Sequence, residues 1–499
     1  MKCKKSSICL ALAMAMFACI SLQTAVANNM KVTNTVLTAG DSTHVFVQAD
    51  VSWDHSWRAS WTDGVVVSNW DAAWIFVKYR YEGGDWRHAS LSTNNNEYVA
   101  PSGSTINAGS SVNAWGTNFG SGVFFYRSTE GSGSWTNTVK LRWNFLQDGL
   151  TRADRVDICV HAIEMVYVPQ GSFKVGDGTT LNIQGQFENG AFTNAFQITS
   201  EGQLTLGGGV AGSLGNNNLA GMAVGDDFND TTTQTLPAAF SKGYNAFYCM
   251  KYEISQGQYA DFLSMLVPAQ AGYRYPDTNG FNRFTISSNA NVYAAGAPDR
   301  SCNFLSWADG AAYADWSGLR PMTELEYEKA CRGPAAPVPN EYAWGDNATI
   351  QSTVNVFGSD GSGTETADPA NANINYGGVG LSGPLRCGIY ATSVSGRIAS
   401  GSAYWGIMEM SGSVWERAVT VGHATGRLFT GANGDGALDA NGDADVGLWP
   451  GSDSNGSGHR GGTWANPFTL IRTSDRCFGA YPSSARNIDT GFRAVRSAP

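Results

Sequence analysis

Residues 305–333 read LSWADGAAYADWSGLRPMTELEYEKACRG and carry the start and stop signals of two helices. Each segment opens with a capping box or a close variant, in which a side chain satisfies an amide at the helix start. Each closes at a glycine, the residue that most often ends a helix. The capping pairs are Ser306 with Asp309 and Thr323 with Glu326, and the closing glycines are Gly318 and Gly333.

A third helix is predicted from SQGQYADFLSML, residues 255–266, where Ser255 and Gln258 form the capping pair. Its apolar residues recur at helical spacing and form one stripe, made of Tyr259, Phe262, Leu263 and Leu266. After Pro334 regular patterning fades into long loops with short apolar runs. Few helices, short strands and long loops indicate an α+β domain over residues 164–499.

The segment from residue 28 to 160 alternates apolar and polar residues in short runs such as VSWDHSW and AAWIFVKYRY. This pattern predicts an all-β sandwich. Nine of the sixteen tryptophans lie between Trp53 and Trp143, so they supply most of its core; an alternative is an aromatic patch that binds carbohydrate. A Gly- and Asn-rich stretch at 179–236 predicts an insertion with mobile tips in the second domain.

The first 27 residues have the composition of a secretory signal, with three lysines before an apolar run and Ala25-Val26-Ala27 as the cleavage site. A lipoprotein signal ending at Cys19 is the alternative. Removal of the signal leaves 29 basic against 42 acidic residues, which argues against a nucleic-acid partner. No later apolar run is long enough to span a bilayer, so we expect a secreted, periplasmic or cell-surface protein.

Seven motifs in order resemble the formylglycine-generating enzyme family, also called the sulfatase-modifying factor family, which uses a C-type-lectin-like fold. The motifs are MVYVPQGSFKVG, FYCMKYEISQGQYADFL, the helical stretch of residues 305–333, YAWGDN, GIMEMSGSVWE, RGGTW and DTGFRAVR. They span about two thirds of the chain. The resemblance implies the fold, whereas function has to be argued from the site itself.

The resemblance also implies two reactive cysteines shortly after RGGTW, which hold copper and engage the substrate thiol. In RGGTWANPFTLIRTSDR, residues 460–476, the matching positions are Asn466 and Ile471, or Arg472 with a gap one residue longer. Thiolates are the ligands that suit Cu(I), so bound copper is not expected. By resemblance Cys477 pairs with Cys331 in a disulfide, while the pairing of Cys159, Cys249, Cys302 and Cys387 stays open.

Other metals than copper have weaker or partial signals in the sequence. No two of the six histidines lie within four residues, so the iron motif of a related branch is not supported, and His459 beside the RGGTW motif is more simply a core or surface residue. The resemblance implies structural calcium at Asn355 and Val356, and a weakened second site at Ser413 and Glu416. The acidic run of residues 433–445 resembles a calcium loop but lacks its twelfth-position Glu, which favours a solvated loop.

Two functions follow from these observations. The first is an exported, non-catalytic binding or structural module that recognises a surface glycan or protein. The second is a metal-dependent oxidase of the same family with a non-standard site. For the first, the predicted ligand-facing residues are Trp464, Asn466, Phe468, Leu470 and Tyr481, although Trp464 could equally fill the core.

Overall fold

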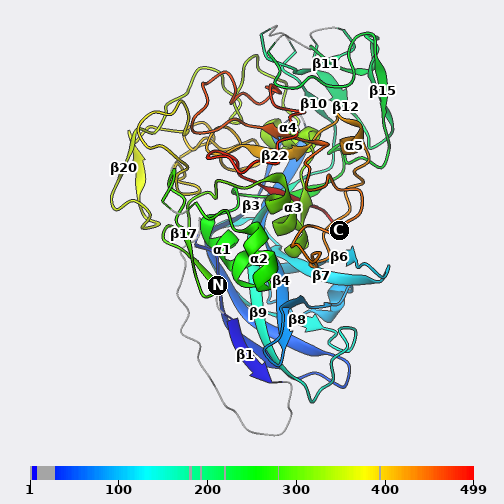
Figure 1. Cartoon of the computed structure of the whole chain (residues 1–499), viewed down its shortest axis with the longest axis vertical. Coiled ribbons are helices and arrows are strands. Elements are labelled where there is room, and N and C mark those ends of the chain that lie inside the picture. Colours follow the sequence, from blue (N-terminus) through cyan, green and yellow to red (C-terminus); the bar gives the residue numbers. More distant parts are fainter. Residues whose placement is uncertain are drawn as a thin grey trace.

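The computed structural model describes residues 3–7, 29–63, 65–178, 182–191, 194–217, 221–278, 280–392 and 395–499 (Figure 1). Its centre is a twelve-stranded antiparallel sheet with the main order β19-β24-β16-β9-β4-β3-β2. The strands are β1 (Cys3–Ser7), β2 (Lys31–Thr38), β3 (Val45–Asp63), β4 (Val65–Tyr81), β5 (Arg87–His88), β6 (Ser104–Val112), β7 (Asn118–Arg127), β8 (Gly131–Trp143), β9 (Arg155–Val168), β16 (Phe247–Met250), β19 (Arg320–Pro321) and β24 (Ala494–Ser497).

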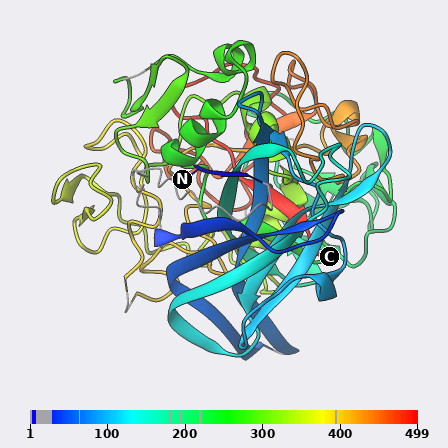
Figure 2. The same ribbon diagram turned by 90° about the horizontal axis from the view of Figure 1, so that it is seen from below.

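Strand β9 joins the N-terminal strands to the rest of the chain. Its first part pairs with β4, with Val160 opposite Val77, and its last residues also pair with β16, with Tyr167 opposite Tyr248. The predicted boundary near residue 160 therefore falls inside one strand. In Figure 1 the blue and cyan N-terminal strands lie below the green-to-red segments, and Figure 2 shows the same arrangement from below.

The N-terminal strands bury apolar side chains on both faces because successive residues of a strand point to opposite sides. One face of β3, β4, β7 and β8 encloses a core that includes Val47, Ile75 and Val123. The other face of β4 and β7, with Trp74 and Phe124, packs into a core shared with helices α1 (Gln256–Ser264) and α3 (Trp307–Trp316). The molecule is mostly β, as expected for its N-terminal part, whereas the sandwich and the C-type-lectin-like fold stay predictions.

The three predicted helix starts are confirmed. Ser255, Ser306 and Thr323 each accept a hydrogen bond from the amide three residues on, and all three capping boxes are complete. Gly333 ends the helix that Thr323 begins, with a φ of 63°, a conformation that favours glycine. The helices are α1 (Gln256–Ser264), α2 (Pro268–Arg274), α3 (Trp307–Trp316), α4 (Glu324–Arg332) and α5 (Ala424–Arg427), with a 3-10 turn, η2, at Asn95–Glu97.

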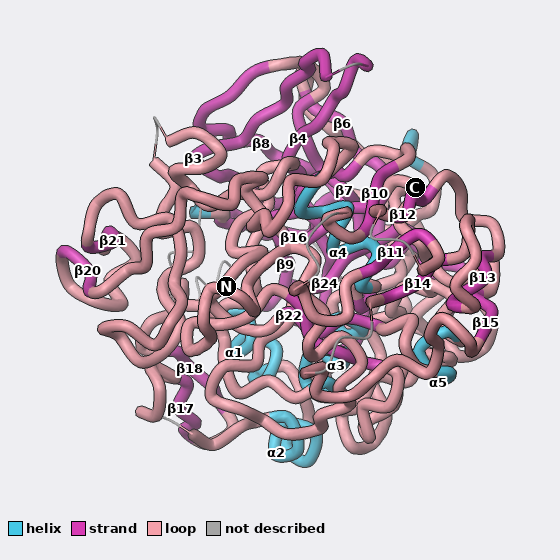
Figure 3. The backbone as a smooth tube through the Cα atoms, turned by 90° about the horizontal axis from the view of Figure 1, so that it is seen from above, coloured by secondary structure: helices cyan, strands magenta, loops and turns pink. Residues whose placement is uncertain are grey.

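Small sheets cover the rest of the second half, which Figure 3 shows to consist mainly of loops. Within the Gly- and Asn-rich stretch, Leu206, Leu214 and Leu236 are fully buried and belong to the same core as helices α1 and α3. No helix among the described residues is long and apolar enough to cross a bilayer. One small sheet has four strands in the order β11 (Phe187–Asn189), β14 (Leu214–Asn216), β13 (Leu204–Gly207) and β15 (Thr233–Leu236). The two-stranded sheets are β10 (Phe173–Val175) with β12 (Phe196–Ile198), β17 (Ile286–Asn289) with β18 (Val292–Ala295), β20 (Asn355–Phe357) with β21 (Thr366–Asp368), and β22 (Glu416–Val419) with β23 (Ser457–Arg460).

Candidate functional site

The RGGTW segment leaves strand β23 and turns sharply above helix α4. Gly461 and Gly462 have φ values of 86° and 69°. A Cβ added at Gly462 would lie 2.3 Å from the side chain of Ile471, so the close return of the loop requires glycine here. The two glycines thus hold residues 460–472 in a compact loop.

A network of buried ion pairs lies beneath this loop. Glu324 and Glu328 are four residues apart and therefore project from the same face of α4. The Arg460 guanidinium contacts Glu324 at 3.2 Å and Glu328 at 2.7 Å, and all three side chains are fully buried. Burial raises the pKa of Glu324, but Arg476 and Arg460 outweigh this and hold it below its usual value. The first arginine of the motif therefore anchors the loop to the helix.

Arg476 extends the network to the Gly- and Asn-rich stretch. Its Nε lies 2.6 Å from Glu324 and its Nη1 lies 2.8 Å from Asp226. At the other end Arg332 pairs with Glu328 and Glu341. Sequence reasoning missed this network, although two glutamates one helical turn apart and arginines in both RGGTW and DRC were visible signals.

The two positions expected to carry reactive cysteines have no thiol. Ile471 is fully buried and packs with Tyr342, Trp344 and Ile374. Asn466 lies in the turn after Trp464, and its backbone carbonyl accepts a hydrogen bond from the Gly377 amide at 2.8 Å. With the longer gap the second position is Arg472, which is mostly buried. An aliphatic, an amide and a cationic side chain offer no soft ligand for Cu(I).

The predicted ligand-facing residues do not all face solvent. Phe468 and Tyr481 are 48% and 37% exposed, and Asn466 and Leu470 are partly exposed. Trp464 is only 5% exposed and belongs to the core, so its assignment to a ligand surface is wrong. Its backbone is fixed on both sides, because its amide donates to the Ser413 carbonyl and its own carbonyl accepts from the Gly378 amide.

The two exposed rings belong to different contact groups. The Phe468 ring centre lies 5.8 Å from the Arg472 guanidinium. Tyr481 instead packs against Phe478 and His459, with ring centres 5.6 Å and 6.0 Å apart. The two exposed rings of the predicted surface therefore have different packing partners.

The sequence profile of the Sulfatase-modifying factor enzyme 1-like domain matches residues 156–498. This chain belongs to that family. The resemblance drawn from the seven motifs is thus confirmed.

Individual relatives match over shorter segments. A hercynine oxygenase of Mycolicibacterium thermoresistibile is 32% identical over 120 residues, 24% of this chain and 20% of that protein. A formylglycine-generating enzyme of Streptomyces coelicolor is 46% identical over 54 residues, 11% of this chain and 17% of that enzyme. A hercynine oxygenase of Mycobacterium tuberculosis is 30% identical over 119 residues, 24% of this chain and 21% of that protein. The matched segments thus span only about a fifth of each relative.

The disulfide implied by the family resemblance is absent, because Cys331 and Cys477 are both free thiols. Cys331 shares a face of α4 with Tyr327 and lies in a hydrophobic core with Trp405. Cys477 follows Arg476 on the side of Glu324, and its thiol donates to the Gly221 carbonyl at 3.2 Å. Each thiol thus has its own buried surroundings, and burial raises their pKa values to about 12 and about 11.

His459 is a core residue of this family member. It is 3% exposed and packs against Trp415, with ring centres 5.8 Å apart. Burial, and to a smaller extent Arg417, lower its pKa well below the usual value for histidine. A neutral, enclosed imidazole does not support the acid/base role that its position beside the motif suggested.

The two calcium positions implied by the family differ in how well they fit a cation. Asn355 is exposed on β20, opposite Asp368 of β21, so oxygen ligands of the kind calcium prefers stand together. At the second position the Ser413 hydroxyl donates to Glu253 at 2.8 Å, and Glu416 accepts from Arg493 at 2.8 Å. The Arg493 guanidinium thus neutralises Glu416, and the second set fits calcium poorly.

The acidic loop of residues 433–445 folds onto helix α3. The carboxylates of Asp315, Asp435 and Asp445 lie within 4.8 Å of one another. The amides of Asp435 and Asp445 donate to Asp315 at 3.0 and 3.1 Å, and the Lys78 ammonium donates to the Gly436 carbonyl at 3.0 Å. The carboxylate of Asp315, which lies on α3 and outside the loop, therefore holds both ends of the acidic segment. The spacing of residues within the loop did not indicate this contact.

Proposed function

We propose that this family member is an exported binding or structural module that does not carry out thiol-based oxidation. The observation that carries the proposal is Ile471, a fully buried aliphatic residue where the family resemblance places a reactive cysteine. A buried aliphatic side chain can neither ligate Cu(I) nor form a bond with a substrate thiol.

The nearby thiols support the same proposal. Burial raises the pKa of Cys331 to about 12 and that of Cys477 to about 11. At neutral pH such thiols stay protonated, whereas the thiolate is the nucleophile and the metal ligand. Neither cysteine is therefore a ready substitute for the missing pair.

The proposed ligand is a surface glycan or a protein, and the proposed location is the periplasm, the cell surface or the medium. The exposed rings of Phe468 and Tyr481 support a ligand contact beside the loop. Calcium at Asn355 and Val356 is proposed as a structural ion only. We also propose that the N-terminal strands form a β-sandwich, which the core enclosed by β3, β4, β7 and β8 supports. For residues 164–499 we propose the C-type-lectin-like fold, which the family match supports.

One observation favours a second candidate, a metal-dependent oxidase with other ligands. The relatives that match are named as a hercynine oxygenase and a formylglycine-generating enzyme. A competition titration with Cu(I) and metal analysis of the purified mature protein distinguish the oxidase from the binding module. The binding-module proposal expects no tightly held copper or iron, whereas one equivalent of either metal would overturn it.

A further inference from the structure

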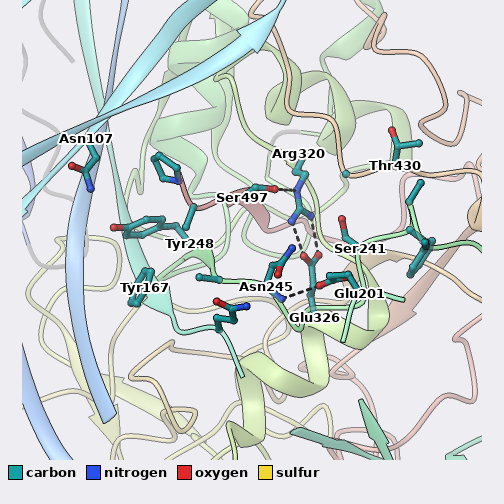
Figure 4. A pocket seen from close by; sticks show the side chains of 18 of the residues that line it. Asn107, Tyr167, Glu201, Ser241, Asn245, Tyr248, Arg320, Glu326, Thr430 and Ser497 are labelled. Carbon is teal, nitrogen blue, oxygen red and sulfur yellow. Dashed lines mark hydrogen bonds and ion pairs between the residues drawn. The ribbon is translucent and has the colours of Figure 1, made fainter. Parts of the chain in front are cut away.

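A pocket of about 640 Å³ lies between the N-terminal strands and the second half of the chain (Figure 4). Strands β4, β7, β9 and β16 supply one wall through Trp70, Tyr126, Tyr167 and Tyr248. Strand β19 and helix α4 supply the other wall through Arg320 and Glu326. No residue of the 460–472 loop lines it, so this pocket is separate from the site described above.

The polar groups of the pocket are fixed before any ligand arrives. The Glu201 carboxylate accepts hydrogen bonds from the amides of Lys242 and Asn245 at 2.7 and 2.9 Å. Arg320 holds Glu326 through two contacts of 2.9 and 2.6 Å. An ionised carboxylate offers about four acceptor positions, so Glu201 can still accept hydrogen bonds from a ligand. A rigid array of this kind loses little entropy on binding.

Rigid aromatic side chains form the opposite wall. Trp70 stacks on Tyr167 with ring centres 3.9 Å apart and planes 9° apart, and its indole N–H donates to the Tyr248 hydroxyl at 3.2 Å. Trp70 and Tyr167 stay partly exposed. In Figure 4 Tyr167 and Tyr248 lie on one side of the pocket, while Glu201, Arg320 and Glu326 lie on the other. A ligand would therefore meet aromatic carbon on one side and hydrogen-bonding groups on the other.

The charge of the pocket restricts the ligand further. Glu326 is matched by the Arg320 guanidinium, and Glu201 lies near the Lys242 and Lys329 ammonium groups without a salt bridge to either. Both ammonium groups donate to backbone carbonyls, so the described lining residues offer no unpaired cation to an anionic ligand. The hydroxyl and amide groups of Ser241, Asn245 and Thr430, which also line the pocket, suit a ligand rich in hydroxyls.

We propose that this pocket binds a neutral saccharide about two sugar units long. Aromatic carbon for the apolar faces of the rings, carboxylate and amide groups for their hydroxyls, and a volume within the range of ligand pockets together fit that class. The inference rests on the proposed binding function and gives it a ligand class and a place. It does not depend on what residues 460–472 do.

The test uses the mature protein and four neutral disaccharides, namely maltose, cellobiose, lactose and sucrose, in isothermal titration calorimetry. At least one should bind saturably with an affinity unchanged between low and high NaCl. Ala239→Trp places a large ring at the pocket, on an exposed residue that lines it, and should weaken binding about tenfold or more. Asn245→Ala and Thr430→Ala should each weaken it about fivefold.

Ala348→Trp is the matched control, because Ala348 is exposed and lies in a turn outside the pocket lining. It should bind like the unaltered protein. Failure of all four disaccharides to bind, or equal binding by Ala239→Trp and Ala348→Trp, would overturn the proposal. Binding that weakens strongly with NaCl would also overturn it, since that result indicates a charged ligand. Copper-dependent oxidation of a thiol would refute the proposed function and leave this result untouched.

Discussion

Replacement of Arg476 by methionine tests the buried ion network most severely. The guanidinium makes contacts of 2.6 and 3.0 Å with Glu324 and of 2.8 and 3.2 Å with Asp226. Without it Glu324 keeps Arg460 at 3.2 Å, but Asp226 has no other cation within a salt-bridge distance among the described residues. Breaking a buried pair in this way costs about 3–5 kcal/mol, because a buried charge is left uncompensated.

Urea denaturation of the mature protein measures this loss. Arg142→Met is the control, because Arg142 pairs with Glu97 at 3.0 Å with both side chains partly exposed, and such pairs contribute about 1 kcal/mol or less. Adding Asp226→Asn to Arg476→Met should recover part of the loss, since it removes the stranded carboxylate. A cost for Arg476→Met no larger than that for Arg142→Met would refute the reasoning.

Three further predictions follow. Trp74→Ala should lower the free energy of unfolding, measured by urea denaturation, by about 3–5 kcal/mol. Trp74 is fully buried between strand β4 and helix α3, and its indole donates to the Ser317 carbonyl at 2.8 Å. A loss below about 1 kcal/mol would contradict its role in joining these elements. Burial raises the pKa of Glu409 from 4.5 to about 7. The protonated carboxyl therefore contributes to the free energy of unfolding below pH 4.5, and this contribution is lost as the pH rises through 7. The free energy of unfolding of Glu409→Gln should therefore rise by about 3 kcal/mol relative to that of the unaltered protein between pH 4.5 and 7. A difference between the two proteins that stays constant with pH would refute the raised pKa of Glu409. Peptide mapping without reductant should find Cys331 and Cys477 unlinked, and a peptide joining them would restore the pairing that the structure lacks.

Local signals in the sequence predicted local structure well. A capping box involves neighbouring residues only, so Ser255, Ser306 and Thr323 could be identified as helix starts without any tertiary contact. Pairing between distant strands has no such signal. Strand β9 pairs with both β4 and β16 and so joins two segments that were predicted to be separate domains. The alternation of apolar and polar residues identifies a strand, but it does not tell which other strand lies beside it.

The candidate site was predictable only where resemblance fixed the positions. The absence of thiols at Asn466 and Ile471 is a property of the sequence. Burial of a side chain cannot be read from the sequence in the same way, because tertiary contacts decide whether an aromatic residue in a short apolar run packs inward or outward. Trp464 packs inward. The predicted disulfide failed for a related reason, since Cys331 packs in a core with Tyr327 and Trp405 while the Cys477 thiol donates to the Gly221 carbonyl.

The central claim is that residues 460–472 lack thiol oxidation chemistry. The most direct measurement is mass spectrometry of a cysteine-containing sulfatase-motif peptide after incubation with the mature protein, copper and oxygen, with a formylglycine-generating enzyme as a parallel positive control. The account predicts an unchanged peptide mass while the control converts its peptide to the aldehyde. Conversion of the peptide by this protein would contradict the account and would show that other ligands hold the metal.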